Sequence, residues 1–323
     1  MGIRFLKTPT FLLILSIITA CKSSDVKEKG QEQQSISTKK TNGNPVIRHI
    51  RTADPSAHIW NDGKVWMYTS QDMEDATFYD SMDGYHAFSS TDMVNWEDHG
   101  EVLHSKNIPW GAKGWMWAPT AIYKNDTYYL IYPHSVEGSK EDMRCGVAVS
   151  DVPQGPFKDI GWIEGVEGQW LDPCVFADDD GKTYLYWGVR EPKVALLKEN
   201  LLELAEEPRS VIYGGDNFFE ASYMHKRNGI YYFSYNAGLG GFYAMGDNPY
   251  GPFEYKGGIN PKQRQDHHSI VEYKGKNYFF YHWQGWNGGT KFRRNTSLEY
   301  LYYNDDGTIQ EIYATQEGVQ KIK

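Results

Sequence analysis

The chain has 323 residues, a formal net charge of −9 at pH 7 and an aromatic content of 15 %. This length allows one large domain or two ordinary ones. The negative charge argues against nucleic acid and anionic membranes as partners, because both carry charge of the same sign. The 24 tyrosines are typical of packed β-sheets and also of sugar-facing surfaces, since both use flat amphipathic rings.

Residues 1–20 have the pattern of a targeting segment. Arg4 and Lys7 precede an apolar run over residues 11–18, which is too short for a stable membrane anchor. The segment ends in a small residue directly before Cys21, and this arrangement resembles a bacterial lipoprotein cleavage site. We therefore predict lipid attachment at Cys21. The alternative is an ordinary signal peptide, in which Cys21 has no special role.

Residues 21–45 are polar and lack a strand pattern, which predicts a flexible tether. Together these features predict a lipoprotein of the bacterial cell envelope, which is attached to the membrane only through its lipid. Its location would be the periplasm, the outer membrane or the cell surface. Two more cysteines follow, Cys145 and Cys174, without the spacing of a zinc site. We expect two buried thiols there, although a disulfide is permitted outside the cytoplasm.

From residue 46 onward, a unit of strand, tight turn and aromatic or β-branched strand occurs five times. A period of about 50 residues in such a chain is typical of a β-propeller. We therefore predict an all-β fold, a five-bladed β-propeller that fills residues 46–323 as a single domain. Three further turn strings are predicted to connect outer strands of blades one, two and four. The unit turns lie at residues 63, 126, 181, 229 and 275, and the outer turns at 90–96, 150–157 and 246–253.

Three acidic residues, Asp54, Asp172 and Glu220, occupy the same position of this unit, each nine residues before its turn glycine. If the units are related by symmetry, the three carboxylates lie on one ring. Like charges on a ring repel, so catalysis is the usual reason to hold them there. An Asp-Pro pair alone is also a common turn element; the coincidence of three equal offsets carries the argument.

Glycosidic cleavage requires two carboxyl groups, one to protonate the leaving oxygen and one to activate water or attack carbon. A third carboxylate nearby can adjust the pKa and the orientation of the acid. Glutamate reaches further than aspartate by one methylene, which suits Glu220 as the proton donor.

The equivalent positions of the other two blades carry different side chains. Trp117 is a candidate stacking platform for a sugar ring, with packing between blades as the alternative. His267 is a candidate to bind substrate or to hold a water or a metal ion, with a structural histidine as the alternative. Arg294 precedes the last predicted strand, over residues 298–303, and is a candidate to balance the carboxylates and bind sugar hydroxyls, with a surface charge as the alternative.

These strings resemble glycoside hydrolase family 43 over residues 46–315. The string that begins at Glu220 is the most specific of them. Two departures touch the site wall, Thr120 and Asp266, where many members have an acidic residue and a glycine. The matching strings are Ala53-Asp54-Pro55, Trp117-Ala118-Pro119, Leu171-Asp172-Pro173, residues 220–232, His267-His268-Ser269-Ile270 and Arg294-Asn295-Thr296-Ser297-Leu298.

The resemblance implies a five-bladed propeller that hydrolyses glycosides with inversion and requires no cofactor. It implies Asp54 as general base, Asp172 as the residue that tunes the pKa of the acid and orients it, and Glu220 as general acid. It implies that His267 lies near the centre, where some members hold calcium, and that Arg294 contacts substrate.

The resulting prediction is a monomeric enzyme that acts on a plant oligosaccharide or polysaccharide and releases arabinofuranose or xylose. The loops at residues 71–86 and 110–115 are long and aromatic enough to wall the site, which favours action on chain ends. Alternatives are an endo-acting arabinanase or xylanase of the same family, a glycan-binding lipoprotein without catalysis, and a propeller that binds proteins.

Overall fold

The computed structural model describes residues 43–139, 142–169, 171–215, 217–238, 240–260 and 267–322, together with the backbone of residues 36–37. The predicted signal peptide, Cys21, and tether residues 22–35 and 38–42 lie outside the described residues. Within the described part of the chain, no helix is long and apolar enough to cross a membrane.

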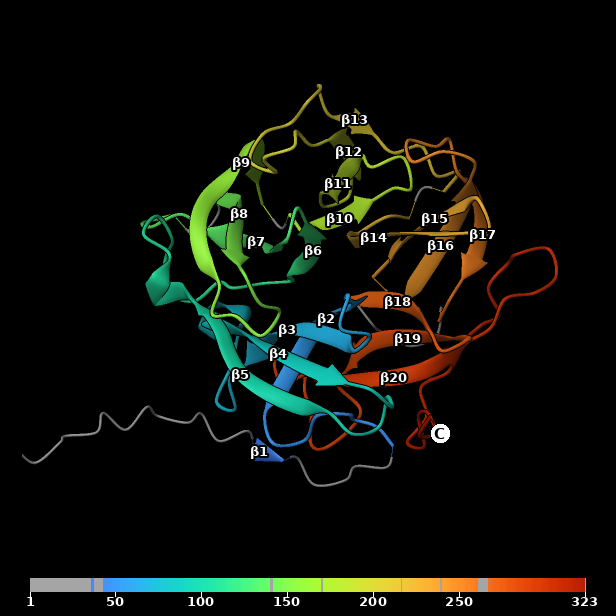
Figure 1. Ribbon diagram of the computed structural model, residues 1–323, viewed down its shortest axis with the longest axis horizontal. Helices are drawn as coiled ribbons and strands as arrows, with labels where there is room; N and C mark the ends of the chain where they lie inside the picture. Colours follow the sequence, from blue (N-terminus) through green and yellow to red (C-terminus); the bar gives the residue numbers. More distant parts are fainter. Residues whose placement is uncertain are drawn as a thin grey trace, which may run out of the picture. The chain divides into compact units, whose positions relative to one another are not determined.

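Five antiparallel sheets follow one another along the chain and surround a common centre (Figure 1). The predicted five-bladed β-propeller is therefore confirmed. Blade one comprises β2 (Arg51–Ile59), β3 (Val65–Asp72), β4 (Gly84–Ser90) and β5 (Glu97–His104), with the short β1 (Ile36–Ser37) added beside β5. Blade two comprises β6 (Thr120–Lys124), β7 (Thr127–Ser135), β8 (Met143–Ser150) and β9 (Lys158–Gly168).

The remaining blades continue the same order. Blade three comprises β10 (Cys174–Ala177), β11 (Thr183–Trp187), β12 (Lys193–Leu196) and β13 (Arg209–Ser210). Blade four comprises β14 (Glu220–Arg227), β15 (Ile230–Asn236), β16 (Gly241–Gly246) and β17 (Glu254–Gly258), and blade five comprises β18 (His268–Tyr273), β19 (Lys276–Trp283) and β20 (Asn295–Leu301). Two 3-10 turns, η1 (Tyr79–Ser81) and η2 (Ser105–Asn107), follow strands of blade one.

The predicted turns lie where the repeat places them. Each unit turn joins the first two strands of a blade, and the three further strings join the third and fourth strands of blades one, two and four. The turn between β14 and β15 shows the local cause: Asn228 and Gly229 both have positive φ, 51° and 79°. Two such residues form the turn whose twist matches that of a β-hairpin.

The hydrophobic core is divided into five clusters, each between two neighbouring blades. Val65 and Met67 of blade one pack with Phe280 and Leu298 of blade five in one of them, and the other four neighbouring pairs are joined in the same way. Nine of the twelve largest fully buried side chains are tyrosines. Packing therefore accounts for many of the tyrosines, as the composition allows.

The ring closes where the start of the described domain lies beside the last strand. The backbone N–H of Val46 donates to Thr296 O at 3.0 Å. The side chain of Asn44 accepts from Leu298 N at 2.9 Å and donates to Glu299 Oε1 at 3.0 Å. The sequence assigned Asn44 to the tether, but here it is buried and connects blade five to the segment that leads into blade one.

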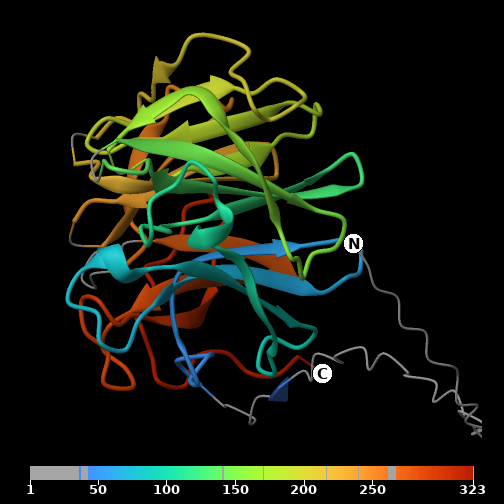
Figure 2. The ribbon, with the colours of Figure 1, turned by 90° about the vertical axis from the view of Figure 1, so that its left-hand side faces the viewer.

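The first strand of each blade starts at one face of the ring and ends at the other. Figure 2 shows η1, in cyan, on the side opposite the turn between β2 and β3. Residues at or just before the start of these first strands therefore gather on one face. That face carries the pocket described next.

Candidate active site

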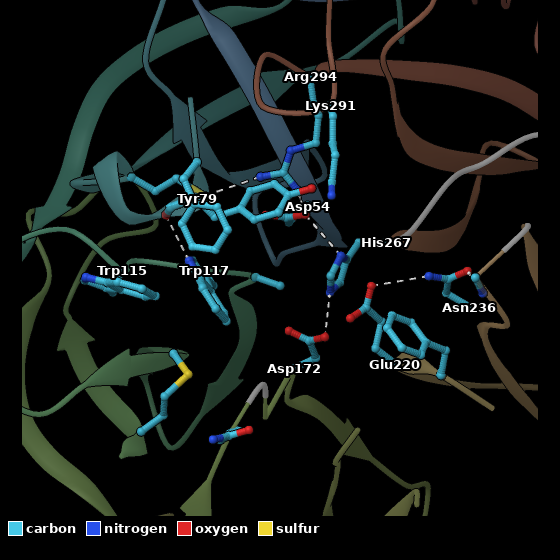
Figure 3. Close-up of a pocket in the computed structure, with 17 residues that line it drawn as sticks. Asp54, Tyr79, Trp115, Trp117, Asp172, Glu220, Asn236, His267, Lys291 and Arg294 are labelled. Carbon is cyan, nitrogen blue, oxygen red and sulfur yellow. Dashed lines mark hydrogen bonds and ion pairs between the residues drawn. The ribbon is translucent and has the colours of Figure 1, made fainter. Parts of the chain in front are cut away.

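A pocket of about 470 Å³ opens at the centre of this face. All six site residues that the sequence singled out line it: Asp54, Trp117, Asp172, Glu220, His267 and Arg294 (Figure 3). Asp54 lies near the start of β2 and Glu220 begins β14, whereas Trp117, Asp172 and His267 precede the first strands of their blades. The equal offsets in the sequence thus correspond to equal places on the ring.

The backbone is unusual at all three acidic positions. Asp54 and Asp172 have φ values of 53° and 39°, and Ala221, directly after Glu220, has φ 60°. The register of blade one shifts between Ala53 and Ser56, and that of blade four shifts after Glu220. A left-handed residue other than glycine costs on the order of 1–3 kcal/mol and is typical of functional sites, and a bulge redirects the side chain that it carries.

Asp54 is buried and surrounded by positive and polar groups. Its Oδ1 lies 2.9 Å from Arg294 Nη1, 3.1 Å from His267 Nδ1 and 3.0 Å from His282 Nδ1. Ser70 donates its hydroxyl to Oδ2. Burial alone would raise the pKa of Asp54, but Arg294 and the two histidines outweigh it and hold the pKa well below its usual value. Asp54 is therefore a carboxylate throughout the neutral range.

Arg294 is held by a second carboxylate that the sequence analysis missed. Asp72, the last residue of β3, accepts Arg294 Nε at 2.9 Å, Nη2 at 2.8 Å and the backbone N–H at 2.7 Å. The remaining nitrogen, Nη1, donates to Asp54. Arg294 therefore bridges two buried carboxylates, which identifies a role beyond the contact with substrate that the resemblance implied.

His267 lies between the two aspartates of the predicted triad. Its Nδ1 is 3.1 Å from Asp54 Oδ1 and its Nε2 is 3.4 Å from Asp172 Oδ2. Neither contact has the direction of a good hydrogen bond, so the attraction is chiefly between charges. Burial lowers the pKa of His267, but Asp172 and Asp54 outweigh this effect and raise the pKa well above its usual value. An imidazolium therefore ties the two carboxylates together.

Glu220 is partly buried, and Asn236 Nδ2 donates to its Oε1 at 3.3 Å. Asn236 ends β15 directly opposite Glu220. The bond from Ser70 to Asp54 is its counterpart in blade one, and in both cases the polar partner lies 16 residues after the carboxylate. That common offset was present in the sequence and was the available signal for both partners.

Aromatic side chains form the walls of the pocket. Phe78, Tyr79 and Trp115 come from the two loops that the sequence predicted as walls. Trp117 Nε1 donates to Tyr79 O at 3.0 Å, and Met116 N donates to Met82 O at 2.9 Å. A side chain at Gly114 would clash with Asp80 O, so the loops press closely together. The aromatic rim is thus a fixed part of the pocket.

One group of described residues has metal-ligand geometry, namely Asp54, His267 and His282. Calcium prefers six to eight oxygen ligands, whereas this group offers one carboxylate and two imidazoles. His267 as an imidazolium has no lone pair to donate, and Arg294 already contacts Asp54. These residues do not fit calcium as its own ligands, so no chemical step is assigned to a metal. His282, on β19, was missed, although a polar residue within an aromatic strand was a signal.

Comparison with known proteins identifies the family. The model of Glycosyl hydrolases family 43 matches residues 42–309. The chain belongs to this family. A xylosidase/arabinosidase of Bacteroides ovatus is 37 % identical to it, over 82 % of the chain and 96 % of the relative. Xylosidase/arabinosidase 43A of Humicola insolens is 36 % identical, over 82 % of the chain and 98 % of the relative.

Solved structures of the same family share the fold. A β-xylosidase/α-arabinofuranosidase from a compost metagenome, in complex with xylotriose and described as calcium-free, has a TM-score of 0.75 and 37 % identity, over 85 % of this chain and 98 % of the neighbour. An enzyme of Xanthomonas citri has a TM-score of 0.78 and 33 % identity, over 89 % of this chain and 96 % of the neighbour. The family match together with these relatives establishes a glycoside hydrolase, so the alternatives without catalysis no longer apply.

Proposed function

We propose that this family 43 enzyme is an inverting, exo-acting hydrolase that releases single arabinofuranose or xylose units from plant oligosaccharides or polysaccharides. One observation carries the proposal: three carboxylates lie at the floor of a single pocket whose walls are aromatic. The names of the relatives, xylosidase and arabinosidase, support a pentose as the sugar released. We further infer that the enzyme acts as a monomer.

The roles of the carboxylates follow from their surroundings. A general base must be ionised before it can accept a proton from water, and Arg294 and the histidines keep Asp54 in that form. Glu220 comes from a different blade and, with its side chain held by Asn236, donates the proton to the leaving oxygen. Asp172 takes the role that the resemblance implies, as the residue that tunes and orients the acid; its Oδ2 also lies 3.4 Å from Nε2 of His267, which faces Asp54.

Exo action follows from the walls. Phe78 and Tyr79 from one loop and Trp115 and Trp117 from another surround the carboxylates, and their hydrogen bonds hold the two loops together. Such a pocket admits a chain end or a branch sugar, whereas the middle of a polymer requires an open groove. Its volume of about 470 Å³ lies within the usual range for small-molecule sites.

The test is product analysis on linear arabinan, arabinoxylan and xylo-oligosaccharides. We expect monosaccharide alone from the first minutes, with the anomeric configuration of the initial product inverted as followed by NMR. A ladder of oligosaccharides with a rapid fall in viscosity would instead establish endo action. An initial product of retained configuration would refute the role of Asp54 as general base, because retention requires a carboxylate that attacks carbon, while leaving Glu220 as the acid.

We also propose that the enzyme is attached by lipid at Cys21 to the bacterial cell envelope. The support is the sequence pattern alone: basic residues, a short apolar run and a small residue before Cys21. A tether between the lipid and the propeller would let the pocket reach an extended substrate while the enzyme stays at the membrane.

A further inference from the structure

Asp72 makes contacts that the proposed acid and base roles leave unexplained. Its side chain is only 1 % exposed, and both of its oxygens accept from Arg294. No sugar-facing role fits it, because Asp72 is not among the residues that line the pocket. An aspartate buried this completely carries a desolvation cost, which is offset only by an ion pair of good geometry.

The geometry of this pair determines where the charge of Arg294 points. A guanidinium is planar, and a carboxylate that accepts from Nε and Nη2 fixes both its plane and its rotation. The backbone N–H of Arg294 also donates to Asp72 Oδ2 at 2.7 Å, so the main chain is held by the same group. The nitrogen that remains, Nη1, is thereby directed to Asp54 Oδ1 at 2.9 Å.

A second effect concerns charge. Without Asp72, the full positive charge of Arg294 would act on Asp54 alone. With Asp72 in place, two carboxylates share that charge. The side chain of Arg294 is 8 % exposed and that of Asp54 is 2 % exposed, so water screens these interactions weakly. Without Asp72, the long arginine side chain has other partners within reach, such as Met82, whose sulfur lies 3.4 Å from Nη2.

We propose that Asp72 is a positioning residue, which acts through Arg294 to hold the carboxylate of Asp54 in the orientation that activates water. The inference rests on the proposed role of Asp54 as the general base. It predicts that loss of Asp72 lowers kcat by a larger factor than it raises KM, because most of the pocket lining is made by residues other than Arg294. Misplacement of a catalytic group by about 1 Å lowers the rate by up to on the order of 100-fold.

The experiment is a double-mutant cycle on an aryl pentoside whose hydrolysis is detectable at very low rates. We expect Asp72→Asn to lower kcat by about 10- to 100-fold in the wild-type background but by less than about threefold in the Asp54→Asn background, because residues that act as a unit are not additive. Losses that multiply, or an Asp72→Asn enzyme with kcat within about twofold of wild type, would overturn the inference.

If Asp72→Asn does not fold, Arg294→Lys is the variant that tests the proposal in its place. Lysine keeps the charge near Asp54 but cannot form the fork with Asp72, so kcat should fall as it does in Asp72→Asn, and an unchanged kcat would contradict the proposal. The matched control is Glu299→Gln, another buried carboxylate with several donors that lies outside the pocket lining; it should lower stability and leave kcat unchanged.

The activity of Asp54→Asn separates the two proposals. If Asp54→Asn keeps wild-type activity, the proposed function fails. If Asp54→Asn is inactive while Asp72→Asn keeps the wild-type kcat, only the present inference is refuted.

Discussion

Replacing Arg294 by Met removes the charge that most strongly keeps Asp54 ionised. Methionine fills a similar volume without a positive group, so the change is mainly electrostatic. Burial raises the pKa of Asp54, and after the substitution only the two histidines would oppose this effect. The pKa of Asp54 should therefore rise. Because the base must be ionised, activity should appear only at higher pH than in the wild type, and the acidic limb of kcat/KM should move upward.

The size of the effect follows from the contact. Arg294 Nη1 lies 2.9 Å from Asp54 Oδ1, which places the two charge centres about 4 Å apart, and such charges attract by about 4 kcal/mol at an effective dielectric constant of 20. That energy equals roughly a thousandfold in proton affinity, since about 1.4 kcal/mol is tenfold. Removing one partner of a buried pair also destabilises the fold by about 3–5 kcal/mol.

Stability should change with pH in the corresponding direction. The pKa of Asp54 is lowered in the folded wild type, so its stabilising effect is present above the unfolded value of about 3.9 and is lost as pH falls through the folded pKa. In Arg294→Met this contribution disappears. The difference in stability between wild type and variant should therefore be large at neutral pH and shrink in acid.

The assay is kcat/KM on an aryl pentoside from the lowest pH at which the enzyme stays folded up to pH 9, with urea unfolding at the same pH values, so that the range extends below the unfolded pKa of about 3.9. Arg51→Met is the matched control, since Arg51 is also buried and bonded to Glu74 and Asn295 but does not line the pocket. It should lower stability without moving the acidic limb. A folded Arg294→Met enzyme with a raised KM and an unmoved limb would refute this reasoning and assign Arg294 to the sugar instead.

Three further predictions concern the acid, the ring closure and the anchor. Glu220→Gln should lower turnover by at least about 100-fold on a poor leaving group but recover much of the rate on a dinitrophenyl glycoside, whose departure needs no acid; no recovery would count against Glu220. Asn44→Ala should lower the unfolding free energy by about 1–3 kcal/mol, because it leaves the buried Leu298 N without its acceptor and removes one of the several donors to Glu299; an unchanged urea midpoint would show that the closure lies elsewhere. Cys21→Ser should move the protein from the membrane fraction to the soluble fraction with full activity, and unchanged fractionation would mean another anchor.

The repeated unit made much of the site predictable from the sequence. In a propeller, equal offsets in the chain become equal places around an axis, so Asp54, Asp172 and Glu220 had to meet once the five units were recognised. Trp117 followed by the same rule and His267 lies one residue from the equal offset, and all five line the pocket. A second common offset, 16 residues after the carboxylate, leads to the polar partners Ser70 and Asn236.

What the sequence alone left open are the contacts across the closure of the ring. Asp72 meets Arg294 across 222 residues, and His282 meets Asp54 across 228. No offset relates Asp72 to Arg294, because they come from blades one and five, which become neighbours only when the last blade packs against the first. The sequence by itself determined the number of blades and which carboxylates share the axis. Only the tertiary structure decided that Asp54 is held ionised, because its ionisation depends on buried partners brought from the opposite end of the chain.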